Sequence, residues 1–114
     1  MSWYTYLFDF VSGLFLANGV PHFVQGVSGH WFQSPFGHPP GVGESSPLSN
    51  TLWGFANLTV GFTLLGFFLP RGAEAAVGWI LLALGILLAA SCLSRRFGRV
   101  RSIQATKYRI RHWP

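Results

Sequence analysis

Three blocks of mostly apolar residues, separated by polar or proline-rich segments, dominate the chain. The third block, residues 75–94, has no charged side chain. As a helix with a rise of about 1.5 Å per residue, it is long enough to cross the hydrocarbon core of a bilayer, which is about 30 Å thick. Residues 52–69 also lack charge, and residues 3–20 carry only Asp9. The pattern predicts an all-α integral membrane protein with three transmembrane helices, at about residues 3–20, 51–69 and 74–94.

The composition agrees with this interpretation. Half of the 114 residues are hydrophobic and 10% are charged, whereas soluble domains carry about 25% charged residues. A core helix of a small soluble protein would need a polar face, and residues 77–90 have none. The N-terminus lacks the basic region of a cleaved signal peptide. The single cysteine, Cys92, excludes an internal disulfide.

The second and third blocks are joined by a short turn of Pro70, Arg71 and Gly72. A connection this short predicts an antiparallel helical hairpin whose two helices pack on each other. Helices in a bilayer associate where small residues let their backbones approach closely. Such contacts, expected within this protein rather than with a foreign helix, are assigned to Gly13, Ala17, Gly54, Asn57, Gly61, Gly85 and Ala89.

Positive charge is concentrated after residue 94, where seven of the eight Lys and Arg residues lie. Such residues favour the cytoplasmic side of a membrane, so residues 95–114 are expected to form a cytoplasmic tail. Basic and apolar residues alternate in residues 107–113, which predicts an extended segment lying along a surface. Anionic lipids are the first expected partner and an acidic subunit the second, while nothing resembles a nucleic-acid-binding module. The basic contact residues are Arg95, Arg96, Arg99, Arg101, Lys107, Arg109 and Arg111.

The long loop at residues 21–50 contains no Lys or Arg and five of the seven prolines. Its first half mixes aromatic and polar residues, as is typical of segments at the headgroup level of a membrane. Trp31 and Phe32 are therefore expected to contact lipid or a partner. The second half is too rich in proline for a helix, and it either packs as a defined loop or serves as a flexible connector.

Three histidines in this loop, His22, His30 and His38, raise the question of a metal site with Glu44. A spacing of eight residues is a rotation of about 80° on a helix, so these side chains share no helical face. We therefore expect hydrogen-bonding histidines and no metal site. A haem or chlorophyll would need a histidine inside a span, and His22, at the expected end of the first helix, is the only candidate. No cofactor is predicted.

Asp9 and Asn57 are the polar side chains whose burial in a span would cost most if they were unpaired. They indicate either a proton or ion path or a hydrogen bond between helices. The second interpretation is favoured because a transport path would need more than one carboxylate without a cation inside the membrane. The chain contains no nucleophile, base and acid at recognisable spacing and no glycine-rich phosphate loop, so an enzyme acting alone is not expected.

The segments 18–23, 38–47 and 50–54, with sequences NGVPHF, HPPGVGESSP and NTLWG, resemble small uncharacterised membrane proteins of bacteria. The resemblance covers most of residues 3–94 and implies a setting in the bacterial inner membrane. It implies no activity and no ligand. The basic tail is not part of it.

These observations lead to a functional expectation. A small membrane protein without catalytic groups, with an aromatic loop and a basic tail, suits a non-catalytic accessory subunit of a larger membrane complex. A bioenergetic complex is expected, either a photosynthetic reaction-centre or light-harvesting assembly or a respiratory one. The alternative is a small homo-oligomeric transporter or channel in which Asp9 and Asn57 line a path between protomers.

Overall fold

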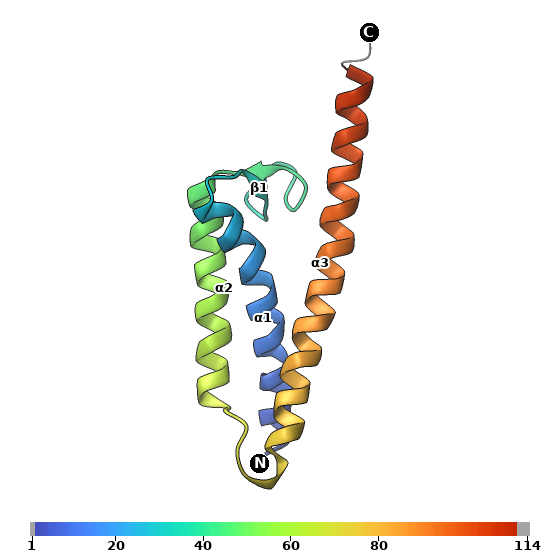
Figure 1. Cartoon of the computed structure of the whole chain (residues 1–114). Coiled ribbons are helices and arrows are strands. Elements are labelled where there is room, and N and C mark those ends of the chain that lie inside the picture. Colours follow the sequence, from blue (N-terminus) through green and yellow to red (C-terminus); the bar gives the residue numbers. More distant parts are fainter. Residues whose placement is uncertain (1, 112–114) are drawn as a thin grey trace.

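The structure is a computed structural model that describes residues 2–111. Three α-helices account for most of the chain: α1 (Trp3–Val27), α2 (Pro47–Phe67) and α3 (Ala75–Arg111). Between α1 and α2, two short antiparallel strands, β1 (Phe32–Gln33) and β2 (Glu44–Ser45), close the long loop. A 3-10 turn, η1 (Gly72–Glu74), leads into α3. The protein is thus all-α apart from a small hairpin at one end of the helices (Figure 1).

The first helix lies between the other two (Figure 1). A short turn follows α2, and α2 and α3 each pack on α1 rather than on each other. The expected direct packing of the hairpin at residues 51–69 and 74–94 is therefore corrected. The reason is that α1 presents small residues on two sides, so the closest backbone approach available to each of the other helices is with α1.

Glycines determine where α1 meets α3. A Cβ atom placed on Gly13 would overlap the carbonyl oxygen of Leu82, and one placed on Gly85 would overlap the carbonyl oxygen of Phe10. Both glycines are buried. The two backbones therefore touch at this crossing, and no larger residue fits at either position without moving a helix.

A second set of small residues determines where α1 meets α2. A Cβ atom on Gly54 would overlap the backbone of Phe23, and one on Gly61 would lie 2.7 Å from the side chain of Leu16. The predicted contact residues Gly13, Ala17, Gly54, Asn57, Gly61 and Gly85 are all buried, and Ala89 is half-buried. Gly19, Gly26 and Gly78 are further buried glycines on these helices, and the sequence pattern did not distinguish them as contact residues.

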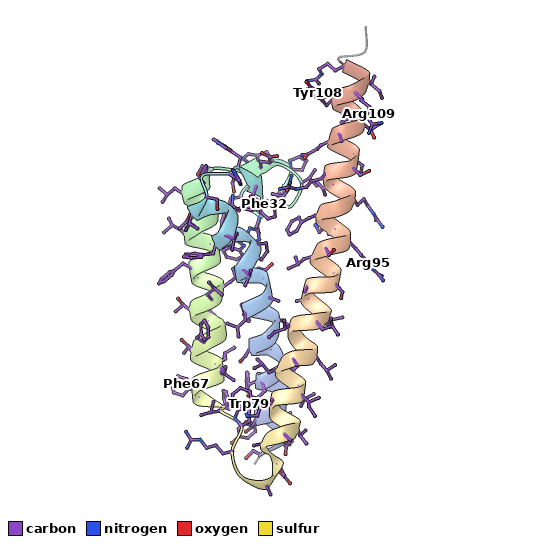
Figure 2. All side chains as sticks on the ribbon, in the orientation of Figure 1. Phe32, Phe67, Trp79, Arg95, Tyr108 and Arg109 are labelled. Carbon is purple, nitrogen blue, oxygen red and sulfur yellow. The ribbon has the colours of Figure 1, made fainter. Side chains whose placement is uncertain are left out.

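The distribution of polar and apolar side chains is the reverse of that in a soluble protein. The largest fully buried side chains are Gln33, Asn50, Asp9, Ser12 and Ser34, and the buried hydrophobic residues are only Ala17, Phe32 and Val100 among those described. Large apolar side chains point outward instead, with Phe67 81% exposed. Figure 2 shows Phe67 on the outside of α2, and Trp79 is also exposed. Only a small part of this apolar surface is covered by the chain itself.

The helix boundaries differ from the predicted spans. The first helix continues through Pro21 to Val27, although the sequence predicts its end near residue 20. A proline inside a helix removes one hydrogen bond and is tolerated where neighbouring helices support the backbone. Toward its C-terminal end α1 leans toward α2 and away from α3 (Figure 1). The second helix begins at Pro47, with the Ser46 side chain accepting a hydrogen bond from the Ser49 amide.

Asp9 and Asn57 have different environments. Asn57 accepts a hydrogen bond from the Asn18 amide at 3.0 Å, and this bond links α1 with α2 as expected. Asn57 also donates a hydrogen bond to the Trp53 carbonyl oxygen within α2, at 2.8 Å. Asp9 is fully buried, yet both carboxyl oxygens lack a hydrogen-bond partner among the described residues. The prediction of a helix-to-helix hydrogen bond is therefore wrong for Asp9. Asp9 faces the start of α3 at Gly78, where a Cβ atom would lie 2.7 Å from its Oδ2, and glycine has no side-chain donor.

At the same end of the protein, the Tyr6 hydroxyl donates a hydrogen bond to the Glu74 carboxylate at 2.6 Å. This bond lowers the pKa of Glu74 below its ordinary value. A carboxyl whose pKa is lower in the folded state contributes stability above its unfolded pKa and loses it as the pH falls through the folded value. We expect Tyr6→Phe to reduce stability slightly at pH 7 and to have a smaller effect at an acidic pH at which Glu74 is protonated in the folded state. Thermal unfolding in mild detergent at both pH values checks this, and an equal loss at both would contradict it.

Candidate functional site

The basic residues lie on a continuous helix and not on an extended tail. Because α3 runs to Arg111, the extended segment predicted for residues 107–113 is wrong up to residue 111, and residues 112–114 lie outside the described part. The alternation over a few residues was a weaker signal than helix continuation. Each residue added to an existing helix gains a backbone hydrogen bond without a new nucleation cost, and Arg, Lys, Gln and Ala favour helices.

All seven basic side chains of this segment are exposed. They are Arg95, Arg96, Arg99, Arg101, Lys107, Arg109 and Arg111. None makes an ion pair with a described residue. Figure 2 shows Arg95 and Arg109 pointing away from the bundle at two different levels of α3. The end of α3, from Arg95 to Arg111, is therefore a positively charged helical segment. Its apolar residues Ile103 and Ile110 are also exposed.

The loop between α1 and α2 contacts the first part of the basic segment of α3. The Gln33 amide donates to the Gln104 side-chain oxygen at 3.2 Å, and the Gln104 amide is 3.5 Å from the Val42 carbonyl oxygen. The guanidinium of Arg101 lies 5.2 Å from the centre of the Phe32 ring, within the range of a cation–π contact. These contacts set the direction in which α3 leaves the bundle.

Phe32 is buried, so its predicted contact with lipid or a partner is corrected. Its ring packs on Phe97 with a centroid distance of 4.8 Å and on His22 at 5.4 Å. Trp31, the other residue of that prediction, is 58% exposed and available for such a contact. Trp31 precedes β1 and is exposed, whereas Phe32 begins the strand and is buried with Gln33.

Between the loop and α3 lies a cleft of about 490 Å³. Arg96, Arg99 and Lys107 contribute positive charge to it, and Val42 and Ile103 contribute apolar surface. Arg96 also packs against Gly41, where a Cβ atom would lie 2.6 Å from its guanidinium. The positive side chains of α3 therefore face the loop across this cleft.

Asn50 is the centre of a buried polar cluster that joins the loop to α1 and α2. Its amide group donates to the carbonyl oxygens of Phe32, Ser45 and Ser46 and to the Ser45 hydroxyl, at 2.9 to 3.2 Å. Its oxygen can therefore only accept, and it does so from Nδ1 of His22 at 2.9 Å. In a neutral imidazole this leaves Nε2 of His22 as an acceptor. The sequence identified His22 but gave no signal for its partner.

Beside this cluster is a cavity of about 140 Å³, lined by residues that include His22, Gln33, Trp53 and Arg96. Oε1 of Gln33 and Nε1 of Trp53 are buried and lack a hydrogen-bond partner among the described residues. A space of this size has room for several water molecules, which can supply the missing bonds. The cavity therefore offers polar contacts to a small molecule.

The three histidines are far from forming a metal site. His22 binds Asn50, His30 lies 2.8 Å from the Gln25 side-chain oxygen, and His38 is exposed on the loop. Within residues 2–111, no three His, Cys, Asp or Glu side chains come close enough to hold a metal ion.

Comparisons of the chain with protein-family models, curated proteins and solved structures found no match.

Proposed function

We propose that this chain is an integral membrane protein whose three helices cross the bilayer. Two helices support the proposal, because Trp3–Val27 and Gly72–Arg111 are long and apolar enough to span a membrane by length and composition. The reversed distribution of side chains supports it further, since outward-facing Leu, Phe and Trp residues suit a lipid solvent. The 21 residues of α2 cover about 32 Å, and its apolar outer face together with its position beside α1 suits a third span.

The proposed orientation places the C-terminal end of α3 in the cytoplasm. The basic cluster at residues 95–111 supports this direction by the positive-inside rule. The N-terminus and the turn at η1 then lie on the outer side, and the loop with its strands lies on the cytoplasmic side. The bacterial inner membrane is the setting that the resemblance of residues 3–94 implies.

We further propose that the protein is a non-catalytic accessory subunit of a larger membrane complex, with a bioenergetic complex as the expected host. One observation carries this proposal: the basic residues continue far along a rigid helix. At about 1.5 Å per residue, Lys107, Arg109 and Arg111 lie about 18 to 24 Å beyond Arg95. Charges separated by more than a Debye length, about 8 Å at physiological salt, are largely screened.

Lipid headgroups at the level of Arg95 are therefore too distant to attract the last three basic residues. An acidic surface of another subunit, reaching out from the membrane beside α3, would supply the matching charge. The exposed Ile103 and Ile110 would add apolar contact to the same interface. The outer part of the helix thus suits a protein partner, while the inner part suits lipid.

A pair of matched variants tests this proposal. One replaces Lys107, Arg109 and Arg111 by Gln, and the other replaces Arg95, Arg96 and Arg99 by Gln, so that each loses three charges. After extraction from native membranes in mild detergent, we expect the first variant to lose more than tenfold of the co-purifying subunits and the second to retain most of them. A wild-type chain that purifies only as a free monomer would overturn the proposal, as would equal losses in the two variants.

The geometry does not favour the alternative of a homo-oligomeric transporter. Asp9 is fully buried between α1 and the start of α3, and Asn57 is bonded to Asn18 between α1 and α2. Both side chains therefore face the interior of one protomer. Neither is available to line a path between protomers.

A further inference from the structure

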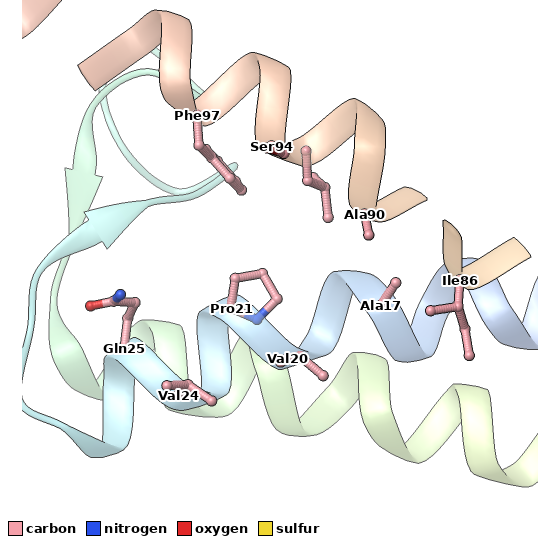
Figure 3. Close-up of a pocket in the computed structure, with 10 residues that line it drawn as sticks. Ala17, Val20, Pro21, Val24, Gln25, Ile86, Ala90, Ser94 and Phe97 are labelled. Atoms are coloured by element: carbon pink, nitrogen blue, oxygen red, sulfur yellow. The ribbon is translucent and has the colours of Figure 1, made fainter. Parts of the chain in front are cut away.

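A groove of about 440 Å³ separates α1 from α3 on the loop side of their crossing (Figure 3). The helices touch at Gly13 and Gly85, and they diverge toward the C-terminal end of α1. The walls are apolar: Ala17, Val20 and Val24 come from α1, and Ile86, Ala90 and Leu93 come from α3. Val20 and Val24 are both 51% exposed, so no described segment of the chain covers the groove.

The length of the groove matches one leaflet of a bilayer. Along α3 it extends from Ile86 to Phe97, which is about 16 Å at about 1.5 Å per residue. The hydrocarbon core is about 30 Å thick, so one leaflet contributes about half of this. In the proposed orientation the closed end of the groove lies near the middle of the membrane, and the open end reaches the level of the first basic residues.

Polar groups gather at that open end. Gln25 and Ser94 line it, on opposite helices (Figure 3). The Gln25 oxygen is occupied by His30 at 2.8 Å, which leaves the amide N–H groups of Gln25 available as donors. The Ser94 hydroxyl has no hydrogen-bond partner among the described residues. Both can donate to phosphate or ester oxygens.

One cation stands next to this end. Arg101 lies one helical turn beyond Phe97, and its guanidinium is held over the Phe32 ring, which in turn packs on Phe97. It makes no ion pair with a described residue. A positive charge fixed by an aromatic ring at the mouth of an apolar groove is suited to an anionic headgroup.

We propose that this groove binds one phospholipid with an anionic headgroup from the cytoplasmic leaflet. An acyl chain lies between α1 and α3, and the phosphate contacts Gln25, Ser94 and Arg101. The proposal concerns the bilayer part of the protein. It is independent of any partner at the outer end of α3, so the two proposals fail in different experiments.

Native mass spectrometry of the purified full chain tests the site. The protein in mild detergent is mixed with equal amounts of phosphatidylglycerol and phosphatidylcholine that carry the same acyl chains. We expect one bound lipid per chain, with phosphatidylglycerol favoured about tenfold. A basic residue near a lipid surface contributes about 1 kcal/mol, so Arg101→Gln should lower this preference about fivefold. Arg109→Gln, which removes the same charge farther along α3, should leave the preference unchanged.

A second pair of variants tests the groove itself. Ala90→Trp fills the groove and should abolish retention of both lipids, whereas Leu87→Trp adds the same ring on the exposed surface of α3 outside the groove and should not. Circular dichroism confirms that each variant remains helical. Equal retention of the two lipids by the wild-type chain would overturn the proposal. Lipid retention by Ala90→Trp at the wild-type level, or a dimer in place of the lipid-bound monomer, would overturn it as well.

Discussion

Replacing Gly13 by alanine is expected to destabilise the protein by about 2 to 3 kcal/mol, although alanine is the better helix former by about 1 kcal/mol. The added methyl group would overlap the carbonyl oxygen of Leu82 and lie 2.8 Å from the amide nitrogen of Ile86. These are backbone atoms, so no side chain can rotate away, and α1 and α3 must separate. Thermal unfolding followed by circular dichroism in mild detergent measures the change.

The same substitution at Gly98, in α3, provides the control. A Cβ atom on Gly98 would meet nothing within 4 Å. Gly98→Ala should therefore show only the gain in helix propensity and raise the stability by about 0.5 to 1 kcal/mol. Opposite signs for the two variants are the expected result. A stabilising effect of Gly13→Ala would show that the helices do not touch at this crossing.

Replacing Asn50 by leucine is expected to cost about 3 to 5 kcal/mol and to release the loop. The change removes the amide N–H groups that donate hydrogen bonds to the carbonyl oxygens of Phe32 and Ser45. It also removes the oxygen that accepts a hydrogen bond from Nδ1–H of His22. Each buried polar group left without a partner costs about 1 to 3 kcal/mol. Limited proteolysis should then cut residues 28–46 at least tenfold faster than in the wild-type protein.

Two further variants separate this effect from a general loss of polarity. Thr59→Ala, at an exposed position of α2, should leave both stability and proteolysis unchanged. Asn50→Asp keeps the shape and the acceptor but loses the amide donors, so it should resemble Asn50→Leu. Resistance of the Asn50→Leu loop to protease would mean that the cluster does not hold the loop in place.

Much of the fold was accessible from the pattern of residues. The lengths of the apolar blocks predicted three helices, and the turn at Pro70 to Gly72 predicted the reversal between α2 and α3. Small residues marked most of the helix contacts. Glycine is a poor helix former, so its presence in an apolar helix indicates a place where two backbones approach closely. The helical end of α3 was missed because a short alternation of basic and apolar residues outweighed helix continuation in the prediction. The sequence did not distinguish between a packed and a flexible form of the proline-rich loop. The structure shows the packed form, which hydrogen bonds from Asn50 and Gln104 stabilise.

The sequence by itself determined the helical class, the apolar blocks and the concentration of positive charge at one end, because these depend on local composition and period. Only the tertiary structure decided that α1 is the central helix, that Phe32 is buried while Trp31 is exposed, and that Asn50 binds His22. It also decided that Gln25 and Ser94 line the same groove and that Arg101 lies over the Phe32 ring. The physical reason is that each of these relations joins residues distant in the chain, and a local pattern carries no information about which surfaces meet.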